Sequence, residues 1–188
     1  NEEIGSLAGT GTAIVSLGSG TLTCGSDGTS TEFSGTLTGG TGGLTKNGAG
    51  TLTFSGSAVN TYTGATAINA GVLVAKKNQA LGTSAGGVLV VSGAALVFDG
   101  GVTYSATEAL TLNGDGGVGD GTGPGALRNF SGTNSFAGPI ALNSNAVISS
   151  PAGTLTLSGA ITSGANTLTK KGAATLVLSG NSIAFTTA

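Results

Sequence analysis

Carboxylates are the main chemically active side chains of this sequence. Its 188 residues include one cysteine and no histidine, methionine or tryptophan. A histidine-based catalytic triad, an imidazole zinc site and a Cys-x-x-Cys pair are therefore excluded. Any general acid–base chemistry has to use carboxyl groups. The acidic residues are Glu2, Glu3, Asp27, Glu32, Asp99, Glu108, Asp115 and Asp120.

Asp99 and Asp120 form the pair best placed for such chemistry. In a fold that repeats every ~20–25 residues, one of them would lie above the other, and Arg128 follows shortly after Asp120. Polysaccharide-cleaving enzymes use clustered carboxylates, often with calcium or a basic partner. We interpret the three residues as corner and loop residues and predict no catalytic residue. A polysaccharide-active enzyme is the alternative.

The glycine-rich segment 113–125 is a candidate ligand loop. Gly116–Asp120 is similar to one unit of a GGxGxD calcium repeat, but such sites need stacked copies and this unit occurs once. The segment also lacks the Lys-Ser/Thr and the helix of a phosphate-binding loop. We predict a corner loop, no metal site and no cofactor, with calcium binding as the alternative.

Three further sets of residues have structural interpretations. Lys46 and Lys170–Lys171 occupy the same position of an internal repeat, which predicts a solvated corner. Tyr62 and Phe136 are also equivalent, and we expect them to pack in the core or at corners and not to form a sugar-stacking platform. Cys24 is interpreted as a small buried residue.

Charge and hydropathy exclude two classes of partner. Six basic and eight acidic residues give a net charge of −2, without the basic patch that nucleic-acid binding requires. No apolar stretch approaches the ~18–20 residues of a membrane-spanning helix. Residues 1–4 have neither the basic start nor the apolar run of a signal peptide, so we expect a mature or excised piece.

The elements that carry these residues are short strands. Apolar residues alternate with Thr in short segments that end at Gly, Asn, Ser or Asp, and no window keeps a helical period. We predict an all-β chain of about 18–20 strands with little or no helix. Examples are 21–24, 51–54, 109–112, 154–157 and 175–178.

An internal repeat indicates how the strands are arranged. Residues 33–56 align without gaps on 157–180, with more than half of the aligned positions identical, and 55–69 has an echo at 131–143. The offset between the copies corresponds to five or six units of about 20–25 residues, the length of one turn of a three-faced β-solenoid. We predict a single solenoid segment over 1–188, with a β-sandwich as the structural competitor.

Residues 44–75 resemble the autotransporter-associated β-strand repeat of large bacterial surface proteins, and a second copy begins at Leu168. The segment departs from the family pattern by two extra residues between Gly56 and Asn60. The resemblance implies a right-handed parallel β-helix of about eight turns and a secreted or cell-surface location. The matching positions are Leu44, Lys46, Gly48, Gly50, Thr51, Leu52, Ser55, Gly56, Asn60, Tyr62, Gly64, Thr66, Ile68, Gly71 and Leu73.

The favoured function is therefore structural. A solenoid has open ends with unpaired strand edges, and neither end of this sequence shows a cap. With few charges to prevent it, we expect the ends to stack on other copies, giving an extracellular fibre, stalk or filament. An adhesin passenger that binds polysaccharide or a cell surface is the alternative.

Overall fold

The computed structural model describes residues 1–83, 85–105, 107–117, 124–180 and 183–184. These residues form 21 strands and contain no helix, so none that could cross a membrane. Every strand pairing among them is parallel. The predicted all-β solenoid is confirmed.

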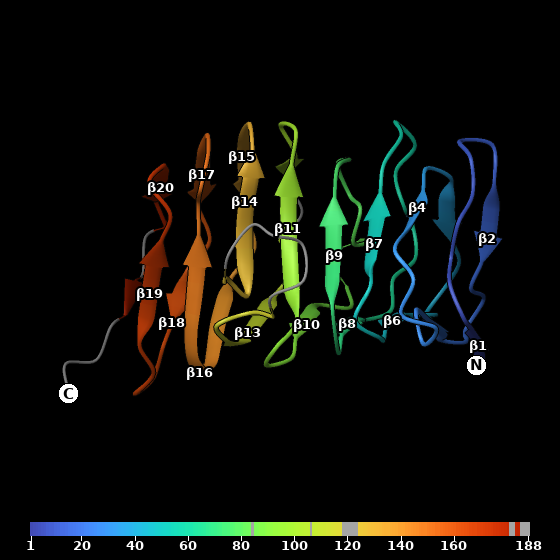
Figure 1. The fold of residues 1–188 in the computed structure, drawn as a ribbon, viewed down its shortest axis with the longest axis horizontal. Coiled ribbons are helices and arrows are strands. Elements are labelled where there is room, and N and C mark those ends of the chain that lie inside the picture. The colour runs from blue at the N-terminus through green and yellow to red at the C-terminus, as the bar shows by residue number, and fades with distance from the viewer. Residues whose placement is uncertain (84, 106, 118–123, 181–182, 185–188) are drawn as a thin grey trace.

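The strands stack in three faces around one axis, and each full turn of the chain contributes strands to two or three of them (Figure 1). The first face contains β1 (Glu2–Ile4), β3 (Leu22–Cys24), β6 (Leu44–Lys46), β8 (Thr66–Ile68), β10 (Val88–Val90), β13 (Leu110–Gly114), the start of β16 (Ile140–Ser149), β18 (Ile161–Thr162) and β21 (Ile183–Ala184). Eight turns separate β1 from β21.

The other two faces are built in the same order. The second face contains β4 (Thr31–Phe33), β7 (Thr51–Phe54), β9 (Val72–Ala75), β11 (Ala95–Asp99), β14 (Leu127–Ser131), the end of β16 and β19 (Leu168–Lys171). The third face consists of two separate sheets, one of β2 (Ile14–Ser16) and β5 (Thr36–Thr38), the other of β12 (Thr103–Tyr104), β15 (Thr133–Phe136), β17 (Thr154–Leu157) and β20 (Thr175–Leu178). The N-terminus and the last strands lie at opposite ends of the stack (Figure 1).

The core is made of ladders of inward-facing apolar side chains in register. Leu22 pairs with Leu44, and on the second face Leu52 pairs with Leu73, which pairs with Leu96. All five side chains are buried. Side chains along a strand point alternately into the core and outward. The Thr residues between the leucines therefore point outward, which explains why Thr and apolar residues alternate in the sequence.

Glycine is required at the corners where successive turns touch. Gly48 has a φ of +68°, and a Cβ at this position would lie 1.8 Å from the carbonyl oxygen of Gly25 in the turn before. Neither the left-handed backbone nor the contact tolerates a side chain. The stacking distance between turns therefore selects glycine here.

The sequence predicts that a whole number of units separates the two copies of the internal repeat. Instead, the two copies lie on different faces of the solenoid. Leu44 lies on the first face, whereas Leu168 lies on the second face five turns later. One turn is also longer than the others, since Leu110 pairs with Ile140 on the first face, whereas Leu22 pairs with Leu44. All three faces use the same inward–outward alternation, so one motif fits any of them.

Candidate functional site

Of the two candidate carboxylates, the structure describes Asp99, which has a structural role at a corner. The Asp99 carboxylate accepts a hydrogen bond from the Ser131 hydroxyl at 2.5 Å and pairs with the Lys76 ammonium at 3.0 Å. Asp120 lies outside the described residues. In register Asp99 is opposite Ser131, whereas Arg128 is opposite Val97. Asp99 therefore ties β11 to β14 and to the chain that follows β9.

Arg128 is fully buried on the outer side of the second face. Its Nε donates to the Gly125 carbonyl at 3.1 Å, and one terminal nitrogen donates to the Gly117 carbonyl at 2.9 Å. The guanidinium thus links Gly117 to Gly125, which flank the extra segment of the longest turn, the one between Leu110 and Ile140. Residues 118–123 of the proposed calcium loop lie outside the described residues. In the rest of the described chain no three carboxylate or thiol side chains cluster as metal ligands.

The corner lysines differ from the prediction of a solvated corner. Lys46 is only 1% exposed, and its ammonium donates to the carbonyls of Asn47, Gly48 and, from the next turn, Ala70. Burial lowers its pKa. Lys170 and Lys171 are exposed as expected. Lys46 is buried because another turn lies above its corner.

Tyr62 and Phe136 pack in the core, as predicted, and neither is exposed. Phe136, Phe98 and Tyr104 form a cluster of three stacked rings, with the Phe136 centroid 6.0 Å from that of Phe98 and 5.5 Å from that of Tyr104, and the other two 6.5 Å apart. The Tyr62 hydroxyl is 2.6 Å from the Thr66 hydroxyl, and burial raises the pKa of this tyrosine. These rings fill the core and offer no outer platform for a sugar.

Glu108 is a buried acid whose importance sequence reasoning missed. Its side chain is 0% exposed, Oε2 lies 2.6 Å from the Tyr104 hydroxyl, and Oε1 has no hydrogen-bond partner among the described residues. The Tyr104 hydroxyl is also 3.1 Å from the Gly82 carbonyl. The single Tyr104 hydrogen can serve only one of these two acceptors at a time, but a protonated Glu108 can donate through Oε2 to the Tyr104 oxygen and leave that hydrogen for Gly82, while Oε1 stays without a partner among the described residues. Burial accordingly raises the pKa of Glu108 to about 7.

Two further reactive groups are also buried by the stacking of turns. Burial raises the pKa of the Cys24 thiol to about 11, and the side chain is 1% exposed, as predicted for a small core residue. Lys77 was not predicted to be buried. Its ammonium donates to the Gly35 carbonyl at 2.7 Å, and burial lowers its pKa to about 8. The Lys77 ammonium thus reaches back two turns, from the end of β9 to the carbonyl that follows β4, across the strand β7 that pairs with both.

One model of a known protein family matches the chain. Two segments, residues 44–75 and 168–184, match the family model of the passenger-associated-transport-repeat. The chain thus contains two segments that are similar to this repeat. The predicted resemblance to autotransporter passenger repeats is thereby confirmed at the same two places. No curated protein and no solved structure matches the chain significantly.

The passenger-associated-transport-repeat is a stacking unit in this fold. The first copy runs from β6 to β9 and the second from β19 to β21. Each contains a strand with an inward-facing leucine, the corner lysine and the glycine corner that follows it. The residues that the two copies share therefore build the corner and its packing.

Proposed function

We propose that the chain is a non-catalytic structural segment of an extracellular fibre or stalk of a bacterial surface protein. Unbroken first-face ladders over eight turns carry the proposal, because a stalk needs one continuous backbone network along its axis. The passenger-type repeat supports a secreted or surface location. The buried ionisable groups support it further, since Lys46, Lys77 and Arg128 all bond to backbone carbonyls.

A binding assay tests this proposal against a ligand-binding role. The purified chain at low concentration is passed over a panel of neutral and acidic polysaccharides and intact cells. A structural segment predicts no saturable binding. Saturable binding by the monomer would overturn the proposal and support an adhesin passenger.

One observation favours the adhesin as the second candidate. On the third face Thr133, Thr154 and Thr175 stand in register, beside a column that includes Ser135 and Thr156. These hydroxyls carry no charge and could bind a neutral polysaccharide through hydrogen bonds. If binding is found in the panel, Thr154→Val should weaken it at least about tenfold, a loss of about 1.4 kcal/mol, while Thr45→Val on the first face should not.

A further inference from the structure

A seam, formed by the segment 78–83 and the strand β12 of the next turn, interrupts the third face. Among the described residues, no backbone–backbone hydrogen bond joins the two sides of this seam. Two side-chain hydrogen bonds bridge it instead. The Thr103 nitrogen donates to Asn78 Oδ1 at 2.9 Å, and the Tyr104 hydroxyl lies 3.1 Å from the Gly82 carbonyl. Side chains therefore hold these neighbouring turns together on the third face.

The backbone of the segment 78–83 is also strained. Gln79 has a φ of +52°, in the left-handed region that is unfavourable for a residue with a side chain. Toward the turn before it the segment is held more firmly, since Asn60 Nδ2 donates to the Ala80 carbonyl at 2.6 Å and backbone hydrogen bonds join the same two turns. The side that faces Tyr104 is therefore the weaker attachment.

The proton on Glu108 decides which acceptor the Tyr104 hydrogen serves. While Glu108 is protonated, it can donate to the Tyr104 oxygen, and the Tyr104 hydrogen is available to the buried Gly82 carbonyl. When Glu108 loses its proton to solvent, its Oε2 takes the Tyr104 hydrogen and the Gly82 carbonyl has no donor. Oε1, which has no partner in the part of the chain that the structure describes, then shares a buried negative charge. Both effects destabilise the closed seam.

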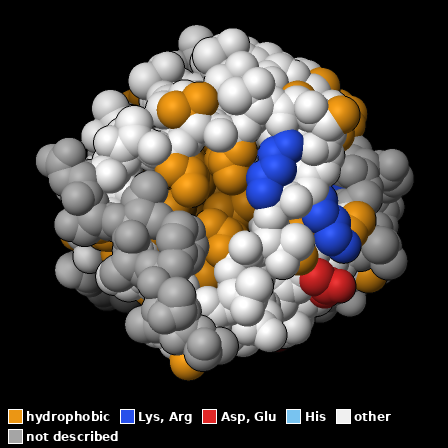
Figure 2. All heavy atoms as spheres, turned by 90° about the vertical axis from the view of Figure 1, so that its left-hand side faces the viewer, with side chains coloured by type: hydrophobic (Ala, Val, Ile, Leu, Met, Phe, Trp, Pro, Cys, Tyr) orange, Lys and Arg blue, Asp and Glu red, His pale blue; other side chains and the backbone are white. Residues whose placement is uncertain are grey.

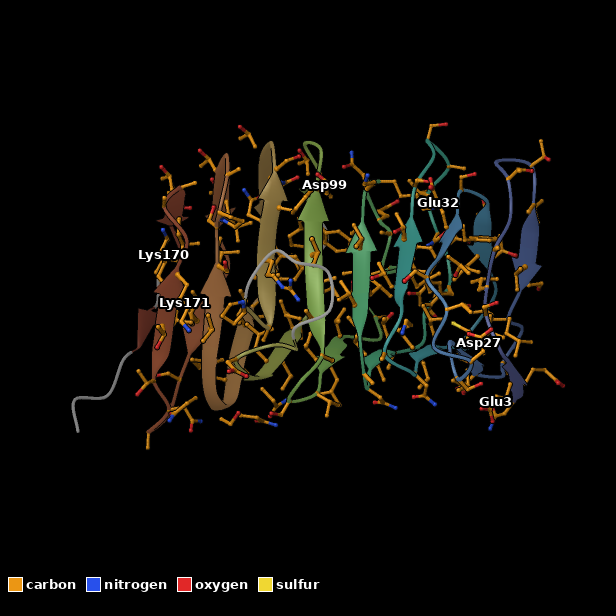
Figure 3. The ribbon with its side chains drawn as sticks, in the orientation of Figure 1. Glu3, Asp27, Glu32, Asp99, Lys170 and Lys171 are labelled. Atoms are coloured by element: carbon orange, nitrogen blue, oxygen red, sulfur yellow. The ribbon has the colours of Figure 1, made fainter. Side chains whose placement is uncertain are left out.

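Glu108 lies in the apolar interior, away from compensating charge. Figure 2 looks along the solenoid axis and shows hydrophobic side chains gathered in the middle, with charged side chains to one side. Tyr62 and Tyr104 are the titratable side chains near Glu108, and burial raises the pKa of both. The buried Lys77 ammonium donates to the Gly35 carbonyl, two turns earlier. The charged side chains labelled in Figure 3 belong to other strands and corners.

We infer that the seam is a pH-sensitive opening point of the solenoid, closed while Glu108 is protonated and opened when it is ionised. Opening lets water reach the carboxylate and the Gly82 carbonyl, and it releases the left-handed backbone of Gln79. The ladders β8–β10–β13 and β9–β11–β14 continue past the seam on the other two faces, so the stack stays intact. The inference goes beyond the proposed structural function, because it identifies a conformational change within the segment. Burial raises the pKa of Glu108 to about 7, which places the change near neutral pH.

Amide hydrogen exchange followed by mass spectrometry at pH 5 and 7.5 tests the seam. The rate of each peptide is compared with that of the unfolded chain at the same pH, which gives its protection factor. Protection of residues 78–83 should decrease at least about tenfold at the higher pH. Because the opening is local, this exchange should depend little on low concentrations of urea, whereas exchange in β17 should depend on them steeply. Equal protection and equal urea dependence in the two segments would mean that 78–83 opens only when the whole chain unfolds, which would overturn the inference.

Two variants test the contact between Glu108 and Tyr104 itself. Glu108→Gln should keep at pH 7.5 the protection that 78–83 has at pH 5, because Gln can still donate to the Tyr104 oxygen. Tyr104→Phe should lower this protection at least about fivefold already at pH 5, because the Gly82 carbonyl loses its donor. Glu3→Gln is the matched control, since Glu3 is exposed on β1, and it should respond to pH like the unmodified chain. A pH response that persists in Glu108→Gln, or unchanged protection in Tyr104→Phe, would overturn the seam and leave the structural function to the polysaccharide panel.

Discussion

Replacing Glu108 by Gln should make the stability of the solenoid less dependent on pH. The carboxyl is fully buried beside Tyr104, and burial raises its pKa from 4.5 to about 7. The folded chain therefore holds this proton at pH values where the unfolded chain releases it. Because the folded pKa is the higher one, the stabilisation is complete below pH 4.5 and is lost as pH rises through about 7.

The size of the effect follows from the two pKa values. Between pH 5 and pH 7.5 a folded pKa of about 7 and an unfolded value of 4.5 reduce the free energy of unfolding by about 2.5 kcal/mol. Lys77, with a pKa lowered by burial to about 8, stays largely charged within this range. Gln has no proton to lose and can still donate a hydrogen bond to the Tyr104 hydroxyl. Glu108→Gln should remove the decrease and stabilise the chain at pH 7.5.

Urea unfolding followed by circular dichroism at pH 5 and 7.5 measures the change. Glu2→Gln is the matched control, because Glu2 is exposed at the N-terminal strand; it should keep the pH dependence of the unmodified chain. If Glu108→Gln also keeps that dependence, Glu108 is not the buried titrating group and the interpretation of its contact with Tyr104 is wrong.

Three other substitutions or reactions test the stacked corners. Lys46→Met should cost about 1–3 kcal/mol because it leaves buried carbonyls without a donor, and Lys170→Met should cost less because that corner is exposed; equal losses in urea unfolding would contradict the burial of Lys46. Gly48→Ala should destabilise far more than Gly28→Ala, which has a similar φ of +72° but open space at its Cβ and should lose only about 1–2 kcal/mol; similar losses would show that contact between turns does not select Gly48. Cys24, with a pKa raised to about 11 by burial, should react with iodoacetamide at pH 8 only after unfolding, and rapid labelling of the native chain, read by mass spectrometry, would show that its turn is open.

Alternation with a period of two made the fold predictable from sequence, because inward leucines and outward threonines recur along the chain. The same alternation also indicates that Lys46 and Glu108 are buried, which was not predicted. Lys46 has the parity of Leu44, and Glu108 that of Leu110, so both point toward the core. Their charge favours solvent, whereas their parity points them inward, and in this fold the parity decides.

Other features could not be read from the sequence because they depend on contacts between turns. Arg128 has the outward parity of its strand, yet it is buried where the Gly117 and Gly125 carbonyls, on either side of the extra segment of the longest turn, accept its hydrogen bonds. The register of the two repeat copies, five turns and one face apart, depends on the length of that same segment. Neither quantity follows from local pattern.

Mass per unit length of filaments of the unmodified chain, measured by scanning transmission electron microscopy, tests the structural role most directly. Eight turns at about 4.8 Å predict a repeat of about 38 Å along the axis. Head-to-tail stacking then predicts one 17.6 kDa chain in each repeat. Two chains in each repeat would mean that copies associate side by side through a face of the solenoid, and would contradict stacking through its ends.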